Sequence, residues 1–492
     1  MTNKSVKSRE IKHSLLHSRP GGIVRNRFNL LTSKEWLPFQ KSWFLYSTDA
    51  DLLRSNIRFF TKSDVGISKV YSSGLPSAES KEIIESEDLQ QISLSENNIS
   101  FAYLDLRKDI EKIASIDEYS KFIEALVIKL NKIFDRLDDR RFICIIAKNH
   151  SIKSRYLPFA WDIGKITGSI FSLKDEKIAC LDVTKDANLS GFRRQGEDVF
   201  YCLYFRKDEL SPRNLGHEVA SSSINWENYL TDEPNTPAWF ILKPPARKKD
   251  EILHPAKYPE ELVDIFVQIF TEKDSNVYDP MSGTGSTQVG AMRNSRNGYG
   301  MELSSFFAEI AIARCEAITN PNQQSLFDSK NESVSKIIND DSMNYKEYDF
   351  PKMHYLLTSP PYWDMLNMKG AENQAKRIEK GLKTNYSEDL NDLGNIADYK
   401  IFIDTLCNLY FDHVDIFVEG AYMTIVVKNI KKKGSNYPFA WDIAFLIQDK
   451  FILLHENFWL QDDISIAPFG YGYTWVSNTF HQYCLHFKLR PR

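Results

Sequence analysis

The segment VYDPMSGTGSTQVGAMRNSRNGYGMEL, residues 277–303, reads as strand, glycine-rich turn, helix and strand. A short apolar strand ends at Asp279, and Gly283 and Gly285 let the backbone pass close to a ligand because glycine has no Cβ. Glu302 follows Asp279 by 23 residues, about the interval at which a nucleotide-binding βαβ unit places an acid on ribose hydroxyls. The segment predicts a mostly parallel α/β sheet, covered by helices on both faces, with ligands at the carboxyl ends of its strands.

Two common phosphate-binding loops fit this segment poorly. No lysine follows the second glycine, which argues against a P-loop, and the third glycine of a dinucleotide fingerprint is not at its required place. The Asp-Pro pair before the loop points to a different kind of nucleotide site.

A second segment, YLLTSPPYW at 355–363, predicts a buried strand that ends in a rigid turn, because proline fixes φ and donates no ladder hydrogen bond. Ser359 and the carbonyls of Pro360-Pro361 offer acceptors, and Tyr362 offers a flat ring beside them. Acceptors next to a stacking ring suit a planar heterocycle with an exocyclic amine. Without any chemistry, the same residues would simply terminate the strand.

TSPPY resembles the catalytic motif of the amino-methylating DNA methyltransferases, whose usual form is Asp, Asn or Ser followed by Pro-Pro and an aromatic residue. DPMSGTGST resembles the DPFxGxGTT loop of the same family, with Met281 for Phe and Ser286 for the first Thr. The resemblance implies the seven-stranded, mostly parallel, Rossmann-like sheet of the S-adenosylmethionine-dependent methyltransferases, with S-adenosylmethionine as the cofactor. It implies catalytic roles for Ser359, Pro360, Pro361 and Tyr362. It implies cofactor contacts for His254, Asp279, Pro280, Gly283, Gly285, Glu302 and Asp341.

Two of these cofactor assignments have alternatives. His254 lies in segment 243–262, which resembles the stretch that closes over the methionine end of the cofactor, but Pro259 and the acids after it would equally suit the start of a helix. Asp341, implied to lie near the adenine amine, is preceded by Asp340, which would serve as an ordinary solvated carboxylate at the strand end.

In the family that TSPPY resembles, the acceptors hydrogen-bond to the amine of an extruded base and align its nitrogen with the methyl group of S-adenosylmethionine. The aromatic ring stacks on the base. The Ser form is most often found in cytosine-N4 members, which favours cytosine N4 over adenine N6. A cytosine-C5 enzyme is disfavoured, because its nucleophilic cysteine usually follows proline and no cysteine of this chain does. RNA or protein-glutamine substrates stay open, and so does a non-catalytic DNA-binding scaffold.

The two halves of the chain share sequence. PFAWDI occurs at 158–163 and again at 438–443, an offset of 280 residues. Upstream of this motif, aligning Tyr103 with Tyr355 gives an offset of 252, which predicts 28 extra residues in the second half between TSPPY and Tyr399. Such similarity predicts a duplicated fold.

The first copy is predicted to be degenerate, because LDLRKD at 104–109 stands where the second copy has TSPPYW. Proline-rich polar sequence separates the copies. We therefore expect an N-terminal arm over 1–35, a degenerate methyltransferase-like domain over 36–207, a linker over 208–235 and a catalytic domain over 236–492.

The net charge of −4 gives no overall basic character, so contact with DNA must come from a local patch. Two lysine-rich stretches are candidates for tracking phosphates. They are Lys369, Lys376, Arg377, Lys380 and Lys383, and the run Lys431 to Lys433. The resemblance implies double-stranded DNA with base flipping as the partner and allows a cognate restriction endonuclease.

The cysteines and the apolar runs set the expected compartment. The six cysteines form no CxxC pair, which predicts reduced thiols and no metal site. No apolar run approaches the roughly 20 residues of a membrane helix. We expect a cytoplasmic prokaryotic protein that works on the nucleoid and has no membrane partner.

Overall fold

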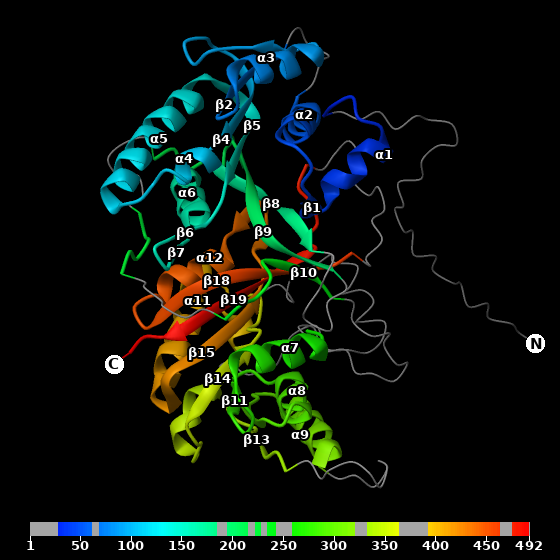
Figure 1. The fold of residues 1–492 in the computed structure, drawn as a ribbon, viewed down its shortest axis with the longest axis vertical. Coiled ribbons are helices and arrows are strands. Elements are labelled where there is room, and N and C mark those ends of the chain that lie inside the picture. The colour runs from blue at the N-terminus through cyan, green and yellow to red at the C-terminus, as the bar shows by residue number, and fades with distance from the viewer. Residues whose placement is uncertain are drawn as a thin grey trace, which may run out of the picture.

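The computed structural model describes residues 28–61, 68–184, 194–214, 222–227, 234–242, 258–319, 332–363, 392–462 and 475–491. Within these ranges fifteen strands form one mixed, mostly parallel sheet. Figure 1 shows the first half of the chain above and the second half below, joined through strands in the middle of the molecule. None of the helices in these ranges is long and apolar enough to cross a membrane.

Eight of the strands come from the second half, and seven of these follow one another in the order β13-β12-β11-β14-β15-β19-β18. They are β11 (Asn276–Asp279), β12 (Asn297–Met301), β13 (Ser335–Ile338), β14 (Met353–Thr358), β15 (Phe417–Val427), β18 (Phe451–Leu460) and β19 (His481–Leu489). Only β19 runs antiparallel to its neighbours in this set. The seven strands predicted for the second half are thereby confirmed.

Helices cover both faces of these strands. On β14, Tyr355 and Leu357 pack in one buried cluster with Phe266, whereas Leu356 packs in another with Phe402, which is the two-residue alternation of a strand buried on both sides. The helices are α7 (Glu260–Phe270), α8 (Ser286–Arg293), α9 (Ser305–Thr319), α11 (Tyr399–Asp412) and α12 (Phe439–Leu446), with 3-10 turns η2 (Ser342–Glu347), η4 (Leu393–Asn395) and η5 (His413–Ile416).

The first half contributes strands in the order β3-β2-β4-β5-β9-β8, which parallels the order of the second half. They are β2 (Lys69–Ser73), β3 (Gln90–Gln91), β4 (Ile99–Asp105), β5 (Leu137–Ala147), β8 (Ser172–Thr184) and β9 (Arg194–Arg206). Its helices are α1 (Ser33–Trp36), α2 (Asp49–Phe60), α3 (Ser77–Ser86), α4 (Arg107–Ile110), α5 (Ile116–Arg136) and α6 (Phe159–Gly168), with the 3-10 turn η1 (Leu37–Gln40). Matching two-strand hairpins are β6 (His150–Ile152) with β7 (Arg155–Leu157), and β16 (Ile430–Lys432) with β17 (Ser435–Tyr437).

Strand register corrects one sequence alignment. Thr358 lies opposite Ile425, and Leu104 lies opposite Ile145, which is 280 residues before Ile425. Leu104 is therefore the counterpart of Thr358, at an offset of 254 rather than 252, and the second half carries 26 extra residues rather than 28. The earlier alignment matched two tyrosines by identity, whereas register follows the hydrogen-bonded ladder.

Two short strands connect the halves. Strand β10 (Trp239–Ile241) pairs with β18 of the second half and with β9 of the first, so it makes the two sheets continuous. Strand β1 (Trp43–Leu45) pairs with β8. The indole of Trp43 donates to the carbonyl of Gln461 at 3.1 Å, and that of Trp239 donates to the carbonyl of Leu181 at 2.8 Å. Each half is thus tied to the other through a tryptophan.

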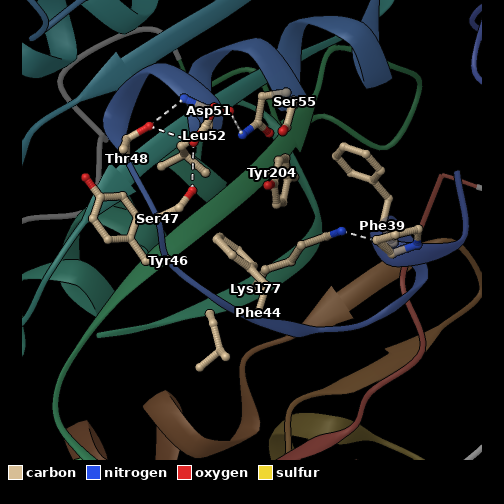
Figure 2. Close-up of a pocket in the computed structure, with 13 residues that line it drawn as sticks. Phe39, Phe44, Tyr46, Ser47, Thr48, Asp51, Leu52, Ser55, Lys177 and Tyr204 are labelled. Carbon is tan, nitrogen blue, oxygen red and sulfur yellow. Dashed lines mark hydrogen bonds between the residues drawn. The ribbon is translucent and has the colours of Figure 1, made fainter. Parts of the chain in front are cut away.

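A cavity of about 220 Å³ lies beside β1, lined by residues of η1, α2, β8 and β9 (Figure 2). Lys177 reaches across it and donates to the carbonyl of Phe39. At the corresponding place in the second half, Asn457 donates to the carbonyl of Pro237. Both contacts hold the segment that leads into the first strand of a half, so we assign this lysine a structural role.

Candidate active site

The carboxyl ends of β11, β12, β13 and β14 meet at one edge of the sheet, because these strands are parallel neighbours. Asp279 ends β11, and Glu302 and Ser359 follow directly on β12 and β14. Asp341 lies three residues after the end of β13. The structure therefore brings the predicted cofactor loop and the predicted catalytic motif to the same edge.

The loop after β11 depends on its glycines. Gly283 and Gly285 have φ of 53° and 75°, in the left-handed region that favours glycine. A Cβ on Gly285 would also lie 2.9 Å from the Cβ of Ala311 on α9. Glycine at 285 is therefore required both by the turn and by the close approach of α9.

Asp279 is buried, with 2% of its surface exposed, and its carboxylate organises the loop. Thr358 Oγ1 and the Met281 amide donate to Oδ1 at 2.7 and 3.0 Å, and Thr287 Oγ1 and the Tyr258 hydroxyl donate to Oδ2 at 3.0 and 3.4 Å. Burial raises the pKa of Asp279 to about 6 against these hydrogen bonds. The Thr358 contact joins the loop directly to β14.

Glu302 lies against the glycine-rich turn. Its Oε2 accepts from the Gly283 amide at 2.7 Å, and its Oε1 accepts from the Ser304 amide at 2.9 Å. Burial, together with the charges of Asp279 and Asp392, raises the pKa of Glu302 to about 7. A desolvated carboxylate beside this turn suits the predicted contact with ribose hydroxyls.

Asp392 is a site residue that the sequence did not reveal. It is 6% exposed, and its Oδ1 accepts from the Gly394 amide at 2.8 Å. Its Oδ2 is buried and has no hydrogen-bond partner in the described part of the chain. Because its charge raises the pKa of Glu302, it belongs to the same site. The only local signal is Asp-Leu-Gly, which is typical of a turn.

The two acids after β13 differ in their contacts. Asp340 accepts from the Tyr348 hydroxyl at 2.8 Å, and this hydrogen bond lowers the pKa of Asp340. Asp341 caps η2 by accepting from the Met343 amide at 3.0 Å and stays partly exposed. Pro280 is buried, and Pro259 directly precedes α7, as the helix alternative expected.

The SPPY turn is held by β15 and β19. Ser359 Oγ donates to the carbonyl of Val426 at 2.9 Å, and Pro360 is buried behind it. The Tyr362 hydroxyl donates to Gln482 Oε1 at 3.0 Å, and desolvation raises the pKa of Tyr362 to about 12. Lys428 Nζ lies 5.2 Å from the centre of the Tyr362 ring. The ring is thus neutral and fixed at one end.

Some predicted contacts lie elsewhere. His254 and the basic residues between 364 and 391 fall outside the described residues. In the run from Lys431, two lysines make contacts within the protein and Lys433 is exposed, so the role of the run in tracking phosphates stays a prediction. Lys431 Nζ contacts Asp175 at 2.5 Å, and Lys432 Nζ lies 3.5 Å from the centre of the Trp363 ring.

Comparison with known proteins finds similarity to DNA methylases. A DNA methylase family model of the N6/N4 type matches residues 76–313, and an N-6 DNA methylase family model matches residues 257–393. The type II methyltransferase M.BglI of Bacillus subtilis is 32% identical over 99 residues, covering 20% of this chain and 25% of that protein. M.ScaI of Streptomyces caespitosus is 31% identical over 129 residues, covering 25% of this chain and 41% of that protein. The chain thus spans less than half the length of these relatives.

Among solved structures, a 16S rRNA methyltransferase of T. thermophilus aligns over 90% of this chain and 91% of its own, at 11% identity and a TM-score of 0.25. A putative methyltransferase of Streptococcus mutans aligns over 48% and 99%, at 12% identity and a TM-score of 0.27. Both TM-scores are below 0.5, so the similarity to DNA methylases is drawn from the sequence matches alone. The chain is similar in sequence to the amino-group DNA methyltransferases, whose cofactor is S-adenosylmethionine.

Proposed function

We propose that this chain is a DNA methyltransferase that transfers a methyl group from S-adenosylmethionine to an exocyclic base amine, with cytosine N4 as the favoured target. The observation that carries the proposal is the 2.7 Å hydrogen bond from Thr358 Oγ1 to Asp279. It joins the cofactor loop to the residue before Ser359, so the methyl donor and the amine acceptor would meet at adjacent strand ends.

The residues at this edge fit S-adenosylmethionine. Glu302 would accept from the ribose hydroxyls and Asp341 from the adenine amine, with Gly283 and Gly285 allowing the backbone close to the ligand. Oδ2 of Asp392, which has no partner in the part of the chain that the structure describes, is a buried acceptor that a ligand ammonium would satisfy. When bound, the cofactor supplies an electrophilic methyl group.

Ser359 would position the base amine. Its hydroxyl proton is directed to the carbonyl of Val426, which leaves oxygen lone pairs to accept from an N–H of the base. Such acceptors align the nitrogen lone pair and stabilise the positive charge that develops on it. The Tyr362 ring, held through Gln482, would stack on the extruded base.

The choice of base rests on Ser359, since the Ser form of the motif is typical of cytosine-N4 enzymes. Adenine N6 is the alternative, and the family model that spans both motifs is described as an N-6 DNA methylase. The named relatives are type II methyltransferases. We therefore also propose that the modification protects DNA sites from a partner restriction endonuclease.

We further propose that the halves, 36–207 and 236–492, arose by duplication and that the first has lost its cofactor site. In the first half, the Arg107 guanidinium binds Asp105 and Asp49 at the strand edge. A Cβ on Gly74, after β2, would lie 1.9 Å from the carbonyl oxygen of Asp105. Groups of the protein itself fill this strand edge, which supports a first copy that binds no cofactor and catalyses no reaction.

The proposal is tested with the purified full chain, methyl-labelled S-adenosylmethionine, and duplex DNA or RNA of matched sequence. Cofactor binding by calorimetry together with label in DNA alone is the expected result. Label in RNA alone would contradict the DNA assignment. Absence of cofactor binding would favour the non-catalytic scaffold.

A further inference from the structure

A carboxylate of the first half is buried among residues of the second. Glu176 on β8 is 1% exposed. Asn429 Nδ2 lies 2.9 Å from both of its carboxylate oxygens, and the Tyr483 hydroxyl donates to Oε2 at 2.7 Å. Asn429 in turn accepts from the Ala440 amide at the start of α12, at 2.9 Å. Glu176 therefore ties together β15, α12 and β19 of the other half.

The two residues held by Glu176 are chain neighbours of two residues that contact the Tyr362 ring. Asn429 follows Lys428, whose Nζ lies over the ring at 5.2 Å. Tyr483 follows Gln482, which accepts from the Tyr362 hydroxyl at 3.0 Å. Both supports of the ring thus depend on backbone that Glu176 fixes.

We propose that Glu176 is a positioning residue for Tyr362, by which the first half completes the catalytic centre of the second. The inference rests on the proposed function and gives the first half a role in it. Replacing one of the two carboxylate oxygens by an amide nitrogen leaves either the Asn429 amide or the Tyr483 hydroxyl without its acceptor, so the strand ends that carry them would shift. Displacements of about 1 Å in a reacting group can cost ~100-fold in rate.

The chain contains a matched control residue at the equivalent position of the other half, 280 residues after Glu176. Glu456 on β18, 3% exposed, accepts from Asn149 Nδ2 at 2.8 Å and from the hydroxyls of Tyr156 and Tyr201 of the first half. There, helix α4 follows β4, and the same offset of 254 residues puts Lys108 at the position that corresponds to Tyr362. Glu456 therefore makes the same kind of buried hydrogen bonds as Glu176 but supports no stacking ring.

The experiment compares Glu176→Gln with Glu456→Gln in the full-length chain. Glu176→Gln should lower kcat for DNA methylation by about 10- to 100-fold, while cofactor affinity by calorimetry stays within about twofold of the wild type. Glu456→Gln should lower Tm by about as much as Glu176→Gln does. It should keep kcat within about twofold of the wild type. Full activity of Glu176→Gln, or equal losses in both variants, would overturn the inference.

A rescue variant separates positioning from folding. Adding Asn429→Asp to Glu176→Gln reverses the donor and the acceptor, so it should recover most of kcat. Hydrogen exchange over residues 426–429 gives a readout without activity. It should be faster in Glu176→Gln than in wild type, and unchanged exchange would overturn the inference. If the wild type transfers no methyl group, the proposed function fails, while this exchange still reports whether Glu176 holds the strand end.

Discussion

Cofactor affinity should rise about tenfold between pH 6 and pH 8, because Glu302 accepts ribose hydroxyls best when ionised. Its pKa is raised to about 7 by burial, so roughly one-tenth of the protein carries the charged form at pH 6 and about nine-tenths at pH 8. Donors on the ligand stabilise the ionised carboxylate and lower its pKa on binding. Affinity is therefore lost as the pH falls through 7.

The assay is calorimetric titration of S-adenosylmethionine into wild type and Glu302→Gln at pH 6, 7 and 8. The α-amino group of the ligand titrates near pH 8 as well, but it is common to both proteins, so the ratio of their affinities isolates Glu302. Asp341→Asn is the matched control and should keep the wild-type pH dependence. A ratio that does not change with pH would refute the assignment of Glu302 to the cofactor site.

Tyr362→Ala should lower kcat on DNA by about 5- to 150-fold, equivalent to ~1–3 kcal/mol of lost stacking, with unchanged cofactor affinity; an undiminished rate would exclude the stacking role. Gly285→Ala should lower the free energy of unfolding by about 2–4 kcal/mol in urea titrations, since its φ is 75° and the new Cβ would lie 2.9 Å from that of Ala311. The folded pKa of Asp279 is raised from 3.8 to about 6, so the contribution of Asp279 to stability is largest below pH 4 and falls by about 3 kcal/mol as the pH rises past 6. Asp279→Asn should flatten this fall, and an equally steep fall in the variant would assign it to other groups.

The sequence predicted the parts of the fold that local patterns encode. The strand, turn, helix and strand from Asn276 to Met301 follow from glycine spacing and apolar runs, and both are local. Gly283 and Gly285 were singled out because a close backbone approach needs glycine, and both have positive φ. Ser359 and Glu302 reach one edge because parallel strands end together.

Long-range contacts could not be predicted in this way. Glu176 lies 253 residues from Asn429, and no local signal distinguishes it from an ordinary strand acid. Asp392 matters because folding buries one of its oxygens with no hydrogen-bond partner among the described residues. The offset of 254 needed the hydrogen-bonded register of β4 and β14, since a match of two tyrosines cannot detect a shift along the ladder.

Methyl transfer to a base amine of DNA is tested most directly by mass spectrometry of nucleosides from DNA incubated with the full-length chain and S-adenosylmethionine. We expect N4-methylcytosine. N6-methyladenine would contradict the assignment from Ser359 while retaining the amino-methyltransferase. 5-Methylcytosine, or no methylated nucleoside in duplexes of varied sequence, would contradict methyl transfer to a base amine by this protein.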